Sequence, residues 1–285
     1  MTIGITGAGG QLGGALLRYA AGRTSASSIV AVTRNPQKVD SGLGVHVRAG
    51  DFNDASGLRA ALEGVERLVI VPTSDLAPGV RSRQHTHAIQ AAKNAGVQHV
   101  IYISTVSPRP DPENTLFNSH FDTEQALIGS GLNWTILRMS VYMDTLVDPA
   151  KRALASGTYS AVPGAPAAYV TRDDIAATAA GILCTPGHAG ITYHATGPAS
   201  VSQQEVADII GSVTGKAIAF SALTQDQHQA GLEAAGLPGF LVKGIVGFYA
   251  GLRAGAFDLV TGDVDRLGGR PAEGAEHFLG RMLKG

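Results

Sequence analysis

The chain is poor in cysteine, in aromatic side chains and in net charge. Cys184 is the only cysteine among 285 residues, so no internal disulfide can form, and a reducing cytoplasm is the expected location. Lysines and arginines number 22 against 23 aspartates and glutamates, a balance that provides no basic surface for nucleic acid or an anionic membrane. Charged residues make up 16% and apolar residues 44% of the chain, which is typical of a globular protein with a large core.

Long apolar runs and metal motifs are also missing. The most apolar late stretch, residues 237–257, is interrupted by Lys243, Arg253 and several glycines, so it predicts a buried or lid helix rather than a membrane span. The first residues already follow a strand pattern, so no secretory leader is expected. His85 and His87 have no carboxylate or third histidine near them at ligand spacing. They predict a pair on a helix surface, and no metal site.

Glycine, by contrast, is abundant, and three glycines near the start follow one another at intervals of three residues. Gly7, Gly10 and Gly13 lie between a short apolar run and an amphipathic run, which indicates a strand, a turn and a helix. Gly7 permits a tight turn, Gly10 lets a pyrophosphate approach the backbone, and Gly13 brings the helix onto the strand. The free N–H groups of that helix would face the phosphates. A turn without a ligand is the alternative. The predicted cofactor contacts here are Gly7, Ala8, Gly9, Gly10, Gln11 and Leu12.

Short β-rich runs then alternate with helical runs through the first half of the chain. Strands are expected at 3–6, 29–34, 45–49, 67–71, 99–104 and 135–138, and helices at 11–21, 55–62, 81–94 and 119–128. This alternation predicts an α/β fold, a Rossmann doubly wound parallel sheet with a smaller, mostly helical C-terminal substrate lobe. We assign residues 1–138 to an NADP-binding core and residues 139–285 to a mixed segment that completes the core and forms the lobe.

The residues after the second expected strand bear on the choice of dinucleotide. An acidic side chain there would bind the ribose of NAD, whereas a basic one would bind the 2′-phosphate of NADP. Arg34 follows this strand, Lys38 lies one helical turn further on, and the first acid is Asp40. A guanidinium can hold a phosphate through two parallel N–H donors. We therefore predict that Arg34 and Lys38 bind NADP(H); two solvated cations on a loop are the alternative.

Polar and aromatic side chains follow the next strands, where open sheets bind their ligands. Asp51 would accept a hydrogen bond from the adenine amino group and Phe52 would pack near the ring. A cap for the next helix is the alternative for Asp51. Hydroxyl groups after the fourth and fifth strands would bind the nicotinamide ribose or the phosphates. For Ser104, after the fifth strand, a structural hydrogen bond at the strand end is the alternative. The residues assigned to the cofactor from these two strand ends are Pro72, Thr73, Ser74 and Ser104.

One catalytic pattern is absent. Ordinary short-chain dehydrogenases use Tyr-x-x-x-Lys for proton transfer, and none of the seven tyrosines has a lysine four residues later. Where that helix is expected, His120 and Glu124 stand one turn apart. With an ordinary pKa of about 6.5, His120 is a candidate to protonate a substrate oxygen. A pair on the helix surface is the alternative. Arg138 ends a core strand and is predicted to be structural.

Several segments together resemble one known family. They are residues 6–14, 32–36, 50–52, 91–97 and 134–138. These segments are similar to those of the NmrA-like atypical short-chain dehydrogenases, and within that family to the branch of NADPH:quinone oxidoreductase type 2 and triphenylmethane reductase. The likeness runs over nearly the whole chain and includes residues 171–172 and 236–238.

The resemblance implies that a Rossmann core binds NADP(H) and that the substrate lies between this core and the lobe. It implies that the turn after the sixth strand approaches the nicotinamide, which makes Tyr142 a catalytic candidate beside His120. It also implies that Tyr169 helps to close the cleft. The cofactor contacts that it adds are Ser140, Val141, Tyr142 and Tyr169.

The function implied is an NADPH-dependent reductase that transfers hydride to a quinone or a similar conjugated acceptor. Such acceptors take up hydride readily, so the protein need supply little acid–base chemistry. The rival within the same family is a non-catalytic NAD(P)-sensing regulatory protein. A nucleotide-sugar epimerase is disfavoured because those enzymes rely on the missing tyrosine–lysine pair. The expected partner is a small molecule, and a homodimer stays open because surface helices of such cores often pair.

Overall fold

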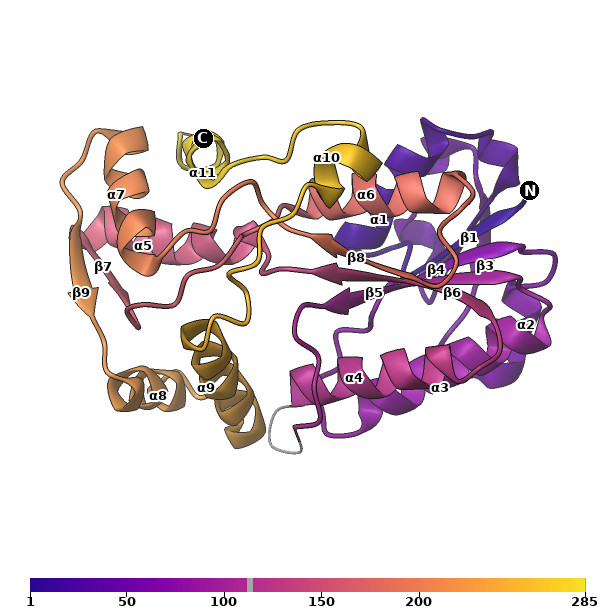
Figure 1. Ribbon diagram of the computed structural model, residues 1–285, viewed down its shortest axis with the longest axis horizontal. Coiled ribbons are helices and arrows are strands. Elements are labelled where there is room, and N and C mark those ends of the chain that lie inside the picture. Colours follow the sequence, from indigo (N-terminus) through magenta and orange to yellow (C-terminus); the bar gives the residue numbers. More distant parts are fainter. Residues whose placement is uncertain (112–114, 285) are drawn as a thin grey trace.

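The computed structural model describes residues 1–111 and 115–284, and its centre is a seven-stranded sheet (Figure 1). The strand order is β3-β2-β1-β4-β5-β6-β8, and every neighbouring pair is parallel. The strands are β1 (Ile3–Thr6), β2 (Ile29–Thr33), β3 (His46–Ala49), β4 (Arg67–Ile70), β5 (His99–Thr105), β6 (Asn133–Met139) and β8 (Ile191–Ala195). The chain order reverses at β1, so the predicted doubly wound fold is confirmed.

Helices cover both faces of this sheet (Figure 1). On one face lie α1 (Gln11–Ala21), α6 (Arg172–Cys184) and α10 (Asp263–Gly268), and on the other α2 (Ala55–Ala61), α3 (Val80–Asn94) and α4 (Thr115–Ile128). The expected helices and strands start and end within about two residues of the observed ones, except that α4 begins at Thr115 instead of residue 119. The short 3-10 turns are η1 (Ala26–Ser28), η2 (Pro36–Lys38), η3 (Ser41–Leu43) and η4 (Met143–Leu146).

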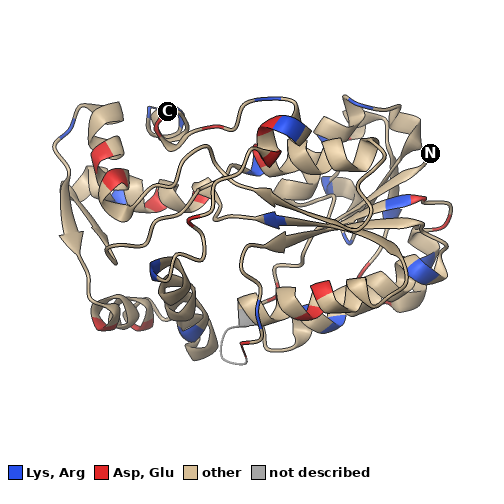
Figure 2. Cartoon of the chain, viewed as in Figure 1, with Lys and Arg blue, Asp and Glu red and all other residues tan. Residues whose placement is uncertain are grey.

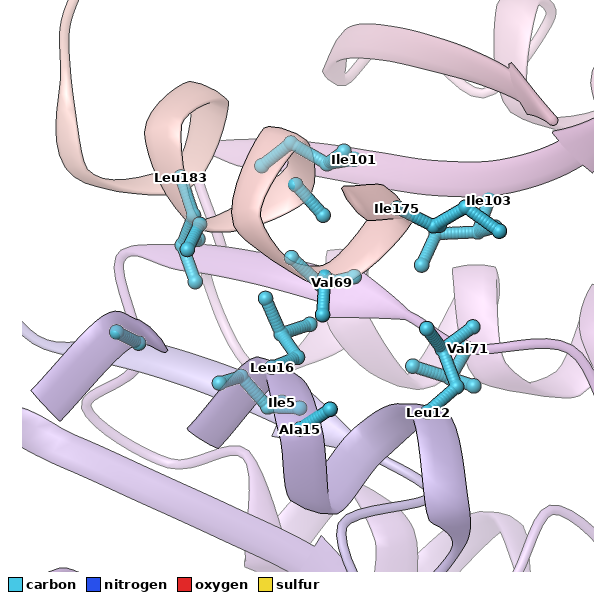
Figure 3. Packing of buried hydrophobic residues seen from close by; sticks show 14 of the residues in the cluster. Ile5, Leu12, Ala15, Leu16, Val69, Val71, Ile101, Ile103, Ile175 and Leu183 are labelled. Carbon is cyan, nitrogen blue, oxygen red and sulfur yellow. The ribbon is translucent and has the colours of Figure 1, made fainter. Parts of the chain in front are cut away.

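Aliphatic side chains fill the layer between the sheet and the helices α1 and α6. Leu16 of α1 and Ile175 of α6 are fully buried, as is Val69 of β4, and Figure 3 shows these side chains gathered between the two helices and the strands. Burying a leucine or isoleucine side chain stabilises the fold by about 1.5–3 kcal/mol. This layer fixes α1 against the sheet, and with it the glycine turn from which α1 starts.

A smaller lobe lies beside the end of the sheet (Figure 1). Its core is a second cluster of buried apolar residues, which includes Leu146, Val206, Ile210 and Phe257. Its elements are α5 (Val147–Ser156), β7 (Thr158–Ala161), α7 (Gln203–Thr214), β9 (Ala219–Ala222), α8 (Gln225–Ala234), α9 (Gly239–Arg253) and α11 (Ala275–Leu283). The parallel pair β7–β9 was not anticipated, because the sequences TYSA and AFSA contain no valine or isoleucine and a serine interrupts each of them.

The chain passes between core and lobe more than once. After α5 and β7 in the lobe it returns to the core for α6 and β8, and after α7, β9, α8 and α9 it returns again for α10 (Figure 1). Helix starts within this part carry side-chain caps. Thr171 accepts a hydrogen bond from the Asp174 N–H, and Ser202 and Glu205 form a reciprocal capping box.

Charged residues of both signs are interspersed on the outer helices and loops, and the visible sheet carries few of them (Figure 2). Within residues 1–111 and 115–284, the helices are all too short or too polar to cross a membrane. The stretch from 237 to 257 forms α9, which is only partly buried and packs against α4: a Cβ on Gly251 would lie 3.2 Å from the Phe117 ring.

Candidate cofactor and substrate site

A cavity of about 650 Å³ runs along the carboxyl ends of β2, β1 and β4. This is the edge at which doubly wound sheets bind ligands, next to the point where the strand order reverses. Many of the residues predicted to contact the cofactor form its wall, and they are Gly7, Gly9, Gly10, Gln11, Leu12, Arg34, Lys38, Asp51, Phe52, Pro72, Thr73, Ser74 and Tyr142.

The glycine turn forms the middle of the wall, and its backbone leaves no room for side chains. Gly7 has a φ of 64°, in the left-handed region that glycine adopts without strain. A Cβ on Gly13 would lie 2.2 Å from the Gly7 carbonyl oxygen, and a Cβ on Gly9 would lie 2.9 Å from Thr33 Oγ1. The turn therefore holds the first residues of α1 directly against the end of β1.

The start of α1 fits an anionic ligand. Its N-cap is Gly10, no side chain caps it, and its first turn contains no acidic residue. The N–H groups and the positive dipole end of the helix thus face the cavity without a competing carboxylate. A pyrophosphate group has the charge and acceptor oxygens that such a helix start binds. The residues present therefore fit the phosphates of a dinucleotide.

Two cations form one end of the cavity. Arg34 and Lys38 are both exposed, on the turn after β2, and both belong to the wall. Thr33 holds this turn, because its Oγ1 accepts a hydrogen bond of 3.2 Å from the Asn35 N–H. Asp40, the acid that follows, is engaged in its own turn, since it accepts a hydrogen bond from the Gly42 N–H. The cationic end is therefore open to a ligand phosphate.

Asp51 and Phe52 lie after β3, beside these cations. Asp51 Oδ1 accepts hydrogen bonds from the backbone N–H and the side-chain amide of Asn53. The cap of α2 is Asp54, whose side chain accepts from the Gly57 N–H, so Asp51 does not cap that helix. Phe52 is half-buried, which leaves part of its ring to line the cavity.

The other end of the cavity is formed by the segment after β4 and by Tyr142, which follows β6. Thr73 Oγ1 is buried and has no hydrogen-bond partner among the described residues. Tyr142 is half-buried, its ring lies 4.8 Å from the Arg172 guanidinium carbon, and burial raises the pKa of its phenol to about 12. Its hydroxyl thus stays protonated and can donate a hydrogen bond at neutral pH.

Five predicted contacts do not belong to the wall. Ala8 and Val141 are buried in the two cores, and Tyr169 is buried in the lobe, where its hydroxyl accepts a hydrogen bond of 2.7 Å from Gln203. Ser104 and Ser140 are buried at the ends of β5 and β6, and each Oγ lacks a partner within the described part of the chain. As binding residues, all five stay predictions.

His120 and Glu124 are buried, so the surface-pair alternative is wrong. Glu124 accepts two hydrogen bonds from Arg138, at 3.0 and 2.6 Å, which gives Arg138 the structural place expected of it. His120 Nδ1 lies 2.7 Å from the Tyr102 hydroxyl. Burial lowers the pKa of His120 well below its ordinary value, with Arg81 and His85 contributing, so it is neutral at pH 7. The ordinary pKa assumed for it is therefore wrong, and its part in catalysis stays a prediction.

The surface position predicted for His85 is wrong as well. His85 is fully buried, and its Nε2 accepts a hydrogen bond of 3.1 Å from the Thr73 N–H, which places its proton on Nδ1. Its Nδ1 lies 3.0 Å from Thr123 Oγ1 and 3.3 Å from the Tyr102 hydroxyl. His85 thus connects the cavity wall to the buried Tyr102 and, through it, to His120. His87 is half-buried, with Nδ1 3.1 Å from the Phe52 carbonyl oxygen.

Sequence reasoning missed several wall residues. Most flank a predicted contact at a strand end, and that position alone could have found them: Val32, Thr33, Asn35, Gly50, Val71 and Asp75. Gln84 comes from α3 instead, one turn after the buried Arg81. No spacing rule marks these two side chains, because a polar residue near a helix start usually faces solvent.

The fold and this cavity define a dinucleotide-binding protein, and comparison with known proteins agrees. Residues 7–186 match the family described as NAD(P)H-binding, and the chain belongs to that family. It is 33% identical to quinone oxidoreductase 2 of Escherichia coli over 284 residues, which cover 97% of this chain and 98% of that protein. The NmrA-like resemblance expected from the sequence is thereby confirmed.

Two solved structures show the same fold over the whole chain. The Escherichia coli NADPH-dependent quinone oxidoreductase complexed with NADPH has a TM-score of 0.91 and 31% identity, covering 99% of this chain and 100% of that one. The Citrobacter sp. triphenylmethane reductase complexed with NADP(H) has a TM-score of 0.89 and 27% identity, with the same coverage. The predicted NAD(P)-binding Rossmann fold is therefore confirmed.

Proposed function

We propose that this protein is an NADPH-dependent reductase that transfers hydride to a quinone or a similar flat, conjugated acceptor. The observation that carries the proposal is the cavity itself, which extends from Arg34 and Lys38, past the glycine turn, to Thr73 and Tyr142. The similarity to quinone and triphenylmethane reductases along the full chain supports the acceptor class.

Each part of the wall has a role in this proposal. Arg34 and Lys38 bind the 2′-phosphate that distinguishes NADPH from NADH, and the start of α1 binds the pyrophosphate. Asp51 and Phe52 contact the adenine. Adjacent parallel strands lie about 4.8 Å apart, so the end of β6 is four strands, roughly 19 Å, from the end of β2. In this proposal the nicotinamide, which supplies the hydride when bound, lies toward Thr73 and Tyr142, and the length of the sheet edge supports that arrangement.

The acceptor then lies between Tyr142 and the lobe. Tyr142 belongs to the cavity wall and, through a bridge between its backbone and Val170, connects the core to the segment that precedes α6. Its protonated phenol orients a carbonyl oxygen by a hydrogen bond.

Steady-state assays with menadione and benzoquinone test the proposal. We expect oxidation of NADPH in the presence of either quinone, and a much lower kcat/KM with NADH. Tight binding of NADP+ with no turnover of quinones, azo dyes or triphenylmethane dyes would contradict the reductase and support the NAD(P)-sensing regulator. A homodimer stays a prediction, which light scattering of the purified protein would decide.

A further inference from the structure

A buried arginine that pairs with no carboxylate among the described residues lies on α3, one turn before the wall residue Gln84. Arg81, on the first turn of α3, is only 8% exposed, and its Nε has no hydrogen-bond partner in residues 1–111 and 115–284. Its one hydrogen-bond neighbour there is His120 Nε2, at 3.5 Å, the outer limit for such a contact. Arg81 also forms no ion pair with the described acidic residues.

Among the described residues, the groups around Arg81 do not form an ion pair with it. His120 is neutral, and the buried carboxylate one turn further along α4, Glu124, is occupied by Arg138. Tyr102 is a protonated phenol within the core, since burial raises its pKa above the ordinary value. Asp75 is exposed and accepts a hydrogen bond from the Ala77 N–H. A buried, unpaired cation costs several kcal/mol, so an anion that reaches Arg81 would be bound strongly.

The position of Arg81 indicates which anion that is. Tyr142 and Asp75, both in the cavity wall, lie within electrostatic range of its guanidinium. The phosphates of a dinucleotide belong at the start of α1 and at Arg34, toward β1 and β2. Arg81 lies instead on α3, three residues before the wall residue Gln84, and its guanidinium reaches His120, which is hydrogen-bonded to Tyr102 of β5.

We propose that Arg81 binds the acceptor oxygen that becomes negatively charged on hydride transfer, and so stabilises the product anion. This inference rests on the proposed function. The reduced nicotinamide transfers a hydride to the quinone and is itself oxidised. The quinone, which has gained one hydrogen and two electrons, becomes a hydroquinone monoanion, and one of its two oxygens carries the negative charge. That oxygen then takes a proton from water. A guanidinium supplies the positive charge that the neutral His120 does not, and donates N–H groups to the oxygen beside Tyr142.

The test combines kinetics with a probe that does not turn over. The variants are Arg81→Met, Arg81→Lys and the control Arg83→Met, which alters an exposed arginine of the same helix. We expect Arg81→Met to lower kcat with menadione by about 100-fold to 1,000-fold, with KM for NADPH unchanged. Arg81→Lys should recover part of that loss, and Arg83→Met should match the wild type.

The probe is 4-nitrophenol, whose anion resembles the product and has its own visible absorbance. In the presence of saturating NADP+, the bound probe should ionise roughly one to two pH units lower than in water on the wild type and on Arg83→Met. On Arg81→Met this shift should vanish. An unchanged shift on Arg81→Met would overturn the proposal. A tenfold or greater loss of NADP+ affinity with an unchanged shift would assign Arg81 to the cofactor.

These outcomes separate the inference from the proposed function. A wild type without turnover of any acceptor contradicts the reductase, while the titration of 4-nitrophenol still decides the role of Arg81. If Arg81→Met fails to fold, Arg81→Lys decides the question. A pKa of the bound probe between its value in water and its value on the wild type supports the proposal. If Arg81→Lys and the wild type have the same kcat and the same probe pKa, the need for a guanidinium is contradicted.

Discussion

Single residues near the cavity acquire their chemistry from neighbours that are distant in the sequence. His120 contacts Tyr102 and Arg81, which precede it by 18 and 39 residues. Its neutral state follows from burial among these groups, and the spacing of His120 and Glu124 on their own helix contains no information about it. Arg34 differs, because its position directly after a strand end was sufficient to predict its place in the cavity wall.

Arg34→Ala should weaken NADPH binding by about 1–3 kcal/mol and leave NADH binding nearly unchanged, because only NADPH has the 2′-phosphate. Fluorescence or calorimetric titration with both nucleotides measures this difference. Arg18→Ala, which removes an exposed arginine from the outer side of α1, serves as the control. Equal losses for the two nucleotides would show that Arg34 does not bind the 2′-phosphate.

The pair formed by Glu124 and Arg138 gives a stability prediction. Arg138→Met should lower the free energy of unfolding by about 3–5 kcal/mol, because Glu124 would remain as an unpaired charge with 3% of its side chain exposed. Urea denaturation measures the change. A second substitution, Glu124→Leu, should restore much of the stability lost in Arg138→Met, whereas Arg59→Met on the exposed side of α2 should be nearly neutral. No recovery in the double variant would contradict this account.

At the scale of elements, periodicity predicted most of the core. Parallel strands that are buried on both faces read as short apolar runs. The strands β7 and β9 were missed because their sequences contain no valine or isoleucine and because their pairing joins segments about 60 residues apart. The wall residue Gln84 was missed because it reaches the cavity from the helix α3, whereas the predicted contacts were sought at strand ends.

The glycine turn allows a matched pair of substitutions. Gly13→Ala would place a Cβ 2.2 Å from the Gly7 carbonyl oxygen, so we expect a loss of about 1–3 kcal/mol of stability together with a large loss of NADPH affinity. Gly14→Ala meets nothing closer than 3.7 Å and should stabilise α1 by up to about 1 kcal/mol. Thermal unfolding with and without NADP+ distinguishes the two variants. Equal behaviour of the pair would contradict the close packing of α1 on the turn.

At the scale of the whole molecule, core and lobe share one interleaved chain. Residues 139–285 supply α6, β8 and α10 to the core as well as the helices of the lobe. The boundary at residue 138 therefore does not separate two compact units, which agrees with the prediction that residues 139–285 both complete the core and form the lobe. The family match over residues 7–186 likewise extends beyond that boundary.

Buried neutral histidines predict a stability that falls in acid. Burial lowers the pKa of His99 to about 4 and that of His85 to about 3. In the unfolded chain both accept a proton at about pH 6.5. Between these values the unfolded state binds more protons than the folded state. The contribution of the two histidines to the free energy of unfolding is therefore fully present above pH 6.5, and it is lost as the pH falls toward 4 and then 3. Each unit of pKa difference corresponds to about 1.4 kcal/mol.

Urea denaturation at a series of pH values measures this decline. His99→Gln should flatten the pH dependence between 6.5 and 4, whereas His46→Gln, which replaces an exposed histidine, should leave it unchanged. The same slope in wild type and His99→Gln would show that His99 is not the group that titrates.

The interleaving of core and lobe also constrains how the protein is made. A chain emerging from the ribosome can pair β1 through β6 early, but β8 arrives some fifty residues after β6, when α5 and β7 of the lobe have already been synthesised. Tyr142 takes its place against Val170 only once that later segment is present. Non-local pairing of this kind is slow to form. The Tyr142 end of the cavity waits for Val170, and the glycine turn waits for α6, which packs against α1, so a nascent chain should hold no dinucleotide until the residues through Cys184 have left the ribosome.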